Sequence, residues 1–266
     1  MREQEVDVTN RGIYRWARAR LAPAALLLFV GCSDSSSTPP PAPRDVTPID
    51  AATAGSIQVQ VSYNGAVPAP KEINMGGTPA CAQLHPDPVY EQTLQVANGQ
   101  LANAVVYIKS GFGSRTFAPP GAPVVIDQQG CLYHPHVSAV MIGQPLQFRN
   151  SDQEPHNVHG RPQTVDGWNF LMSRPNSTRD VFFDKTEVGI PVGCDVHPWM
   201  RAYVSVIDNP FFAVTPASGA VTLQTVPPGD YVVAVWHETL GTLVKPVTVP
   251  PSGTAALEFA FQKAES

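Results

Sequence analysis

The sequence contains few charged residues, few cysteines and few long amphipathic runs. Charged residues make up 15% of the 266 residues, and the 22 acidic side chains outnumber the 17 basic ones, so we expect no nucleic-acid partner. We find no motif of a serine hydrolase, a zinc protease, a phosphate-binding loop or a c-type haem site, and therefore expect no enzyme. The 28 prolines and 20 glycines favour short strands and turns over helices.

The N-terminal segment, residues 1–31, is typical of a secretory signal peptide. Four arginines precede an apolar run, "LAPAALLLFV", that is too short to span a bilayer. The run ends in "FVGC", which resembles the lipobox of bacterial lipoproteins and implies cleavage before Cys32 and lipid attachment to its sulfur. The alternative is an ordinary secretory peptide. Residues 32–54, rich in Ser and Pro, are expected to form a disordered tether. We therefore expect a membrane-anchored lipoprotein of the periplasm or cell surface.

Short alternating segments separated by turn formers run through the rest of the chain. The segment "SIQVQVSY", residues 56–63, alternates apolar and polar side chains, as in a strand with one buried face. Similar segments include "NAVVYIKSG", "RAYVSVID" and "DYVVAVWHE". Turn formers such as Asn64-Gly65 lie between them. This pattern predicts an all-β chain that folds into β-sandwiches.

Three residues with metal-binding atoms occur at regular spacing in "CDVHPWM": Cys194, His197 and Met200. A thiolate and a thioether are soft donors and an imidazole is an intermediate one, a combination that favours copper. Two histidines, a cysteine and a weakly bound methionine make a blue-copper site. Zinc, the main competing metal, normally recruits more Cys, His or carboxylate. A second histidine should come from "PHNVH", which contains His156 and His159. Positions three apart on a strand point to opposite faces, so only one of the two is expected to reach the metal.

These paired motifs resemble the cupredoxins, and the amicyanin-like members in particular, over residues 121–208. In that group the first histidine of "PHNVH" is a ligand and a "C-x-x-H-P-x-M-R" loop supplies three more. The resemblance implies a Greek-key β-sandwich that binds one type 1 copper ion through His156, Cys194, His197 and Met200. It also implies an electron carrier whose partner is a redox protein such as a c-type cytochrome or a periplasmic oxidoreductase. The alternative is a copper-binding, copper-carrier or recognition lipoprotein without an electron-transfer role.

Residues beside the ligands are expected to tune the site. Asn157 is expected to bond to the backbone beside Cys194. Asp195 replaces the small hydroxyl residue or proline that we expect after the cysteine. His197 is expected near the surface, where its outer edge would be the route for electrons. Trp199 is expected either in an apolar rim around that histidine or in the core.

Two further cysteines, Cys81 and Cys131, occur in "CAQLH" and "CLYHPH". In an oxidising compartment, the simplest interpretation is a disulfide between them. The alternative is a second metal site with His85 and His136. The two exclude each other, because a disulfide cannot donate thiolates. His237 is expected to be a structural histidine.

The C-terminal segment "SGAVTLQTVPPGDYVVAVWHETLG", residues 218–241, resembles the second half of a carboxypeptidase regulatory-like domain. That domain is a small transthyretin-like β-sandwich, and residues 55–61 with "NAVVYIKSG" fit its first half. The resemblance implies a sandwich split into residues 55–120 and 209–263, with the cupredoxin domain inserted at an exposed loop. The alternative is two domains in series, in which the first part adds strands to the cupredoxin.

Overall fold

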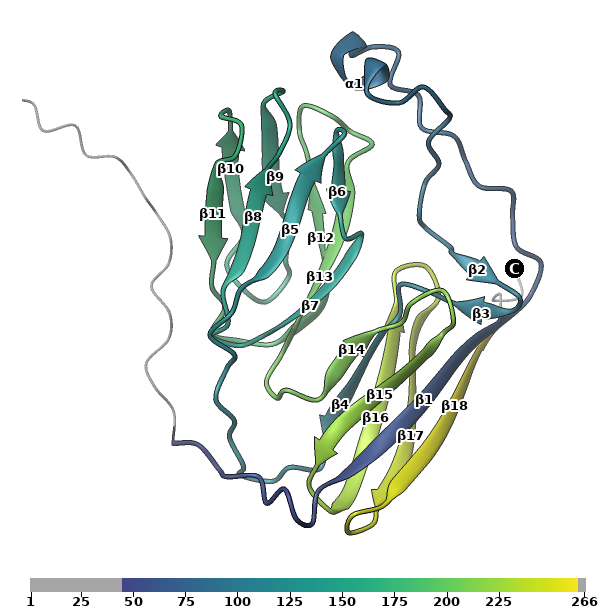
Figure 1. Ribbon diagram of the computed structural model, residues 1–266, viewed down its shortest axis with the longest axis vertical. Coiled ribbons are helices and arrows are strands. Elements are labelled where there is room, and N and C mark those ends of the chain that lie inside the picture. Colours follow the sequence, from purple (N-terminus) through teal and green to yellow (C-terminus); the bar gives the residue numbers. More distant parts are fainter. Residues whose placement is uncertain (1–44, 263–266) are drawn as a thin grey trace, which may run out of the picture. The chain divides into compact units, whose positions relative to one another are not determined.

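A computed structural model describes residues 45–262, which fold into β-strands and one short helix (Figure 1). The eighteen strands of this described part lie in four sheets, so the predicted all-β class is confirmed. The expected signal peptide, residues 1–31, and Cys32 lie outside the described residues. Between residues 45 and 262, no helix is long and apolar enough to cross a membrane.

The first sandwich consists of strands from both ends of the described chain. They are β1 (Gly55–Asn64), β2 (Val96–Ala97), β3 (Gln100–Leu101), β4 (Val105–Ser110), β14 (Phe212–Val214), β15 (Ala220–Val226), β16 (Gly229–His237), β17 (Gly241–Val249) and β18 (Thr254–Gln262). One sheet has the order β15–β1–β3–β2, with β18 also paired to β1, and the other has the order β14–β4–β16–β17. Alternate residues of β1, such as Ile57 and Val59, are buried in one core with Val233 of the second sheet.

The second sandwich consists of the strands between residues 124 and 207. They are β5 (Val124–Gln129), β6 (Leu132–His134), β7 (Val137–Met141), β8 (Leu146–Asn150), β9 (His156–Gly160), β10 (Trp168–Met172), β11 (Thr178–Val181), β12 (Glu187–Gly193) and β13 (Arg201–Ile207). The sheets have the orders β10–β9–β12–β13–β7 and β11–β8–β5–β6. Phe148 of one sheet and Val158 of the other lie in the same core. This packing holds the ends of β9 and β12 in place.

The long connection between β1 and β2 contains the cap, which we define as residues 71–91. An isolated antiparallel bridge closes its base, and helix α1 (Pro79–Gln83) lies within it (Figure 1). Met75 and Cys81 of the cap belong to the core of the second sandwich. The expectation that residues 55–120 all join the first sandwich is therefore wrong for the cap. The physical reason is that its apolar side chains are buried against the second core.

The last part of the expected tether, residues 45–54, packs on the first sandwich. The backbone nitrogen of Thr47 donates a hydrogen bond to the carbonyl oxygen of Thr116 at 2.8 Å. Ile49 is partly buried against the core of that sandwich. The prediction of a disordered tether is wrong for these ten residues, because they contain an apolar side chain and backbone groups that find partners.

His237, at the end of β16, is buried, and its ring makes contacts typical of a structural residue. Its Nδ1 accepts hydrogen bonds from the backbone nitrogen and the hydroxyl of Thr239, at 3.3 and 3.2 Å, whereas its buried Nε2 has no partner. Burial, with a smaller contribution from the charge of His136, lowers the pKa of His237 to about 4. The ring is therefore neutral at neutral pH in the folded protein.

This histidine predicts a loss of stability in mild acid. The unfolded chain takes up a proton on His237 below about pH 6.5, and the folded chain does so only near pH 4, so stability falls as the pH falls between these values. We expect His237 to cost about 2–3 kcal/mol at pH 4.5 relative to pH 7.5. Urea unfolding of the wild type and of His237→Gln at both pH values isolates this contribution. Equal pH dependence in the two proteins would contradict the prediction.

Candidate metal centre

The loop between β12 and β13 is a tight turn that begins at Cys194 and ends at Met200. The backbone nitrogen of Cys194 donates to the carbonyl oxygen of Met200 at 3.3 Å, and the backbone nitrogen of Met200 donates to the carbonyl oxygen of His197 at 2.9 Å. Both ends of the loop are buried in the core of the second sandwich. The loop therefore places the thiol of Cys194 and the thioether of Met200 next to each other in the same core.

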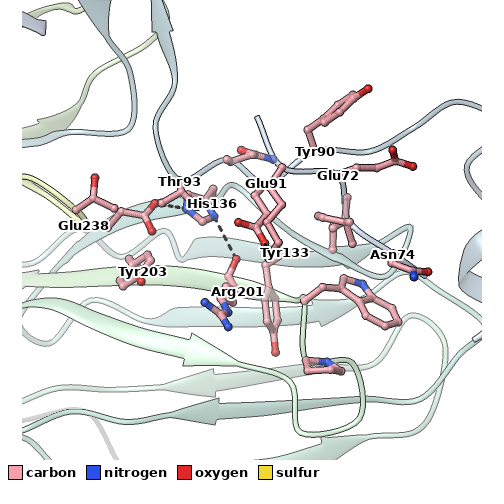
Figure 2. Close-up of a pocket in the computed structure, with 17 residues that line it drawn as sticks. Glu72, Asn74, Tyr90, Glu91, Thr93, Tyr133, His136, Arg201, Tyr203 and Glu238 are labelled. Atoms are coloured by element: carbon pink, nitrogen blue, oxygen red, sulfur yellow. Dashed lines mark hydrogen bonds and ion pairs between the residues drawn. The ribbon is translucent and has the colours of Figure 1, made fainter. Parts of the chain in front are cut away.

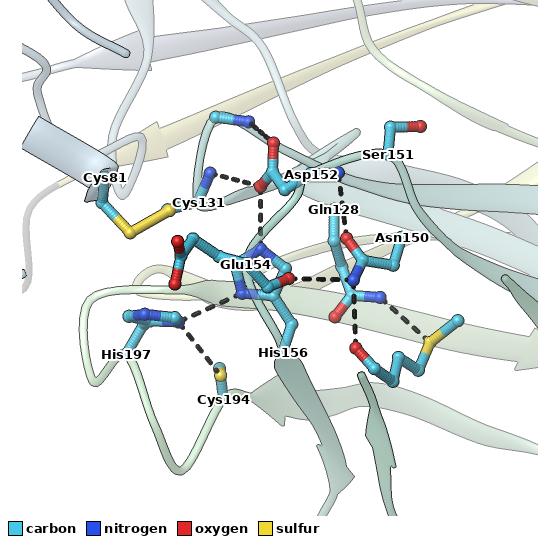
Figure 3. A network of polar contacts seen from close by, with 12 residues as sticks. Cys81, Gln128, Cys131, Asn150, Ser151, Asp152, Glu154, His156, Cys194 and His197 are labelled. Carbon is cyan, nitrogen blue, oxygen red and sulfur yellow. Dashed lines mark hydrogen bonds and ion pairs between the residues drawn. A yellow bond between two sulfur atoms is a disulfide. The ribbon is translucent and has the colours of Figure 1, made fainter. Parts of the chain in front are cut away.

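The three strongest donors converge at one place (Figure 3). His156 is the first residue of β9, which pairs with β12 and so lies beside the loop. The Nδ1 atoms of His156 and His197 are 3.1 Å apart, and the Sγ atom of Cys194 is 3.7 Å from Nδ1 of His197. Ligand atoms of the three residues all lie within 4.8 Å of one another. Met200, fully buried, is in the same core.

This arrangement fits a metal ion with soft ligands. In zinc sites with the same donors, metal–nitrogen bonds are about 2.0–2.1 Å and metal–sulfur bonds about 2.3 Å. Two nitrogens on one ion are then at most about 4.2 Å apart, and a nitrogen and a sulfur at most about 4.4 Å. The observed separations of 3.1 and 3.7 Å lie within these limits. Two imidazoles and a thiolate, with a methionine on the same loop, are a donor set that suits copper.

Hydrogen bonds determine the charges of the metal-free site. Burial alone would lower the pKa of His156, but its hydrogen bonds to Asp152 and Cys194 outweigh burial and raise that pKa to about 9. Burial would raise the pKa of Cys194, but hydrogen bonds from His156 and from the backbone nitrogen of Asn157, at 3.3 Å, lower it overall. Burial, and then the charge of His156, lower the pKa of His197. The site therefore favours a thiolate, the form that binds metal.

Asp152 orients His156, a role that the sequence analysis missed. Its Oδ2 lies 2.7 Å from Nε2 of His156, so the other ring nitrogen faces the metal site. The same carboxylate accepts hydrogen bonds from the backbone nitrogens of Gly130 and Cys131, at 2.7 and 2.8 Å. An aspartate four residues before the histidine was visible in the sequence. That spacing is not informative by itself, and only the folded turn identifies the contact.

We expect Asp152→Asn to weaken both the proton affinity and the metal affinity of His156. Loss of the carboxylate charge should bring the pKa of His156 well below its value of about 9 in the wild type. Loss of the orienting bond should reduce copper affinity by about 10–100-fold. NMR titration of the metal-free protein and competition with a copper chelator measure the two effects. Glu154→Gln is the matched control, because it removes a nearby charge that does not bond to His156; an equal effect of both variants would contradict the assignment.

Tyr133 of β6 was also missed. Its hydroxyl contacts the carbonyl oxygen of Asn157 at 2.6 Å and that of Gly193 at 3.2 Å. Burial, and then the charge of Cys194, raise its pKa, so the hydroxyl remains a donor. Tyr133 thus ties together the end of β9 at His156 and the end of β12 before Cys194.

Asn157 and Asp195 lie beside the ligands but face different ways. The side-chain Oδ1 of Asn157 accepts a hydrogen bond from the backbone nitrogen of Asp195 at 3.1 Å. The carboxylate of Asp195 lies at the surface, 2.8 Å from Arg161 and 3.0 Å from His159. His159 therefore points away from the metal site, as alternation along β9 predicts. The aspartate that stands at position 195 in place of a small hydroxyl residue or proline therefore contacts surface residues, Arg161 and His159.

The predicted disulfide between Cys81 and Cys131 is confirmed, with an S–S distance of 2.03 Å. The alternative metal site with His85 and His136 is wrong for this structure, because both thiols are in the disulfide. The ring of His85 contacts a backbone oxygen at 2.6 Å instead. His136 contacts Glu238 at 2.5 Å in a pocket of about 510 Å³, which Trp199 also lines (Figure 2).

The expectation that His197 lies near the surface is wrong. Its side chain is only 2% exposed. The sulfur atoms of Cys81 and Cys131 lie within 4.8 Å of one of its ring nitrogens. The ring of Trp199 lies 5.2 Å from that of His197, and its Nε1 donates to the carbonyl oxygen of Cys131 at 3.0 Å. The disulfide, which joins the cap to the second sandwich, thus packs beside the imidazole.

Comparison with known proteins gives only partial likenesses. No family model and no curated protein sequence matches the chain. Among solved structures, two amicyanin variants in their Cu(I) forms are 20% and 23% identical; each likeness covers 39% of this chain and 98% of amicyanin, with a TM-score of 0.29. A copper-containing nitrite reductase from Thermus scotoductus SA-01 is 16% identical over 55% of this chain and 28% of its own, with a TM-score of 0.32. At these identities and TM-scores the likenesses assign no function to this chain.

Proposed function

We propose that this chain is a type 1 copper protein that carries single electrons between redox partners at the cell envelope. The observation that supports the proposal is the convergence of a cysteine sulfur and two histidine nitrogens within 4.8 Å. They come from the start of β9 and from the loop after β12, and Met200 is buried at the end of that loop. This set of donors is the one that type 1 copper requires.

His156, Cys194, His197 and Met200 would hold the ion, which supplies one-electron chemistry when bound. The fold shields these four residues from water, because none is more than 5% exposed. Asp152 fixes the ring of His156, and the backbone nitrogen next to that histidine donates to the sulfur of Cys194. Such fixed contacts limit how far the ligands move when the charge at the site changes, which favours rapid electron transfer.

The proposal extends to partner and location. A net charge of −5 suits a redox protein with a basic docking face, such as a c-type cytochrome or a periplasmic oxidoreductase. Lipid attachment at Cys32 would hold the carrier at a membrane. We also propose that the first sandwich is a carboxypeptidase regulatory-like domain and that the protein is not an enzyme.

The burial of His197 favours a second candidate function, copper carriage without electron transfer. An electron carrier benefits from a ligand edge that a partner can approach, and here a disulfide and Trp199 pack beside that ligand. A covered site protects a bound ion from solvent while the protein carries it. The two functions differ in whether the ion stays bound in both oxidation states.

The deciding experiment is the optical and EPR spectrum of the copper-loaded protein, followed by voltammetry. Electron transfer predicts intense visible absorption from the copper–thiolate bond and a reversible one-electron wave. Carriage predicts that Cu(I) passes readily to a chelator. A copper-loaded protein without copper–thiolate absorption would overturn the first proposal.

A further inference from the structure

The Cys81–Cys131 disulfide lies directly beside the candidate metal centre (Figure 3). Its two sulfur atoms and a ring nitrogen of His197 are within 4.8 Å of one another. Cys131, Asp152 and His156 form a second group whose potential ligand atoms also lie within 4.8 Å of one another. Both cysteines are fully buried, so these sulfurs face protein atoms. A purely structural crosslink could close the cap at many points, whereas this one lies against both histidine ligands.

We propose that reduction of this disulfide creates a second copper site, in which the thiolates of Cys81 and Cys131 and the imidazole of His197 hold Cu(I). Thiolate and imidazole are the soft and intermediate donors that Cu(I) prefers. The inference rests on the proposed function, because His197 belongs to both sites. It adds a dithiol site for Cu(I) uptake next to the site of Cys194.

The chemistry balances with a dithiol as reductant. Two electrons and two protons pass to the sulfurs of Cys81 and Cys131, the S–S bond breaks, and the reductant becomes a disulfide. Binding of Cu(I) then displaces the two thiol protons, and the copper keeps its oxidation state. In the oxidised protein the same sulfurs are bonded to each other and bind no metal.

The packing indicates which sulfur moves when the bond opens. Cys131 is held by the hydrogen bond from its backbone nitrogen to Asp152, at 2.8 Å, and by Trp199, which donates to its carbonyl oxygen at 3.0 Å. Cys81 lies in α1, a single turn inside the long cap. We therefore expect Cys131 to stay beside His197 and Cys81 to shift with the cap, which makes room for an ion between the sulfurs.

The test uses the full chain with Cys194→Ser, which removes the thiolate of the first site. The protein is reduced with a phosphine and titrated against Cu(I) held by bicinchoninate, and loss of the chelator's colour reports transfer. We expect the reduced variant to bind one more Cu(I) than its oxidised form and one more than Cys81→Ser/Cys131→Ser/Cys194→Ser. The triple variant retains Cys32 and so controls for that thiol. Circular dichroism of each reduced sample verifies that it is folded.

X-ray absorption then tests the ligand set. We expect two sulfurs and one nitrogen around Cu(I), and His197→Ala in the Cys194→Ser background should weaken binding at least about tenfold. Equal Cu(I) uptake by the triple variant, or a spectrum with sulfur ligands only, would overturn the proposal. Failure of this test can be distinguished from failure of the blue-copper proposal, which is judged on the oxidised wild type with Cys194 intact.

Discussion

Cys194→Ser is expected to abolish nearly all of the intense visible absorption of the copper-loaded protein. That absorption requires a copper–thiolate bond, and Cys194 is the only free cysteine among residues 45–262. A serine hydroxyl is a harder and weaker ligand, so copper affinity should fall as well. Optical spectra of the wild type and the variant at equal copper loading measure the effect. The fold should persist, because the substitution keeps the size of the side chain.

His159→Ala is the matched control for this prediction. It removes a histidine three residues after His156 that lies at the surface beside Asp195. Its spectrum should equal that of the wild type. If His159→Ala lost the absorption and Cys194→Ser kept it, the ligand assignment would be wrong.

Cys81→Ser/Cys131→Ser is expected to lower the free energy of unfolding by about 4 kcal/mol. The disulfide closes a loop with a sequence separation of 50, and the chain-entropy model gives this magnitude for a loop of that length. Burial of two serine hydroxyls in the second core adds to the cost. Urea unfolding of the metal-free protein measures the change, and metal-free conditions prevent copper binding from contributing.

Metal-free Cys194→Ser serves as the control for this stability effect. It replaces a buried thiol in the same core but removes no crosslink. A cost for the double variant no larger than for this single variant would show that the disulfide contributes little through the unfolded chain. Added dithiol should destabilise the wild type and leave the double variant unchanged.

Local sequence patterns predicted many of the strands, but they could not predict features that depend on contacts between distant segments. Strands with strict alternation, such as β1, were predicted because their burial follows a period of two. Strand β9, with the sequence HNVHG, has one apolar side chain and so shows no alternation, and β12 contains Pro191, which weakens any strand pattern. The cap was placed with the wrong sandwich, because no local pattern states which core will bury Met75 and Cys81.

The sequence by itself determined the all-β class, the donor types of the site and their spacing along the loop, because residue chemistry and strand period are local properties. It also limited Cys81 to one simple disulfide partner. Only the tertiary structure decided that His197 is buried beside that disulfide and that Asp152 orients His156. These contacts join segments from different strands and loops, and their distances depend on how the whole core packs. The physical reason is that spacing along a chain specifies which groups exist, whereas packing specifies which of them meet.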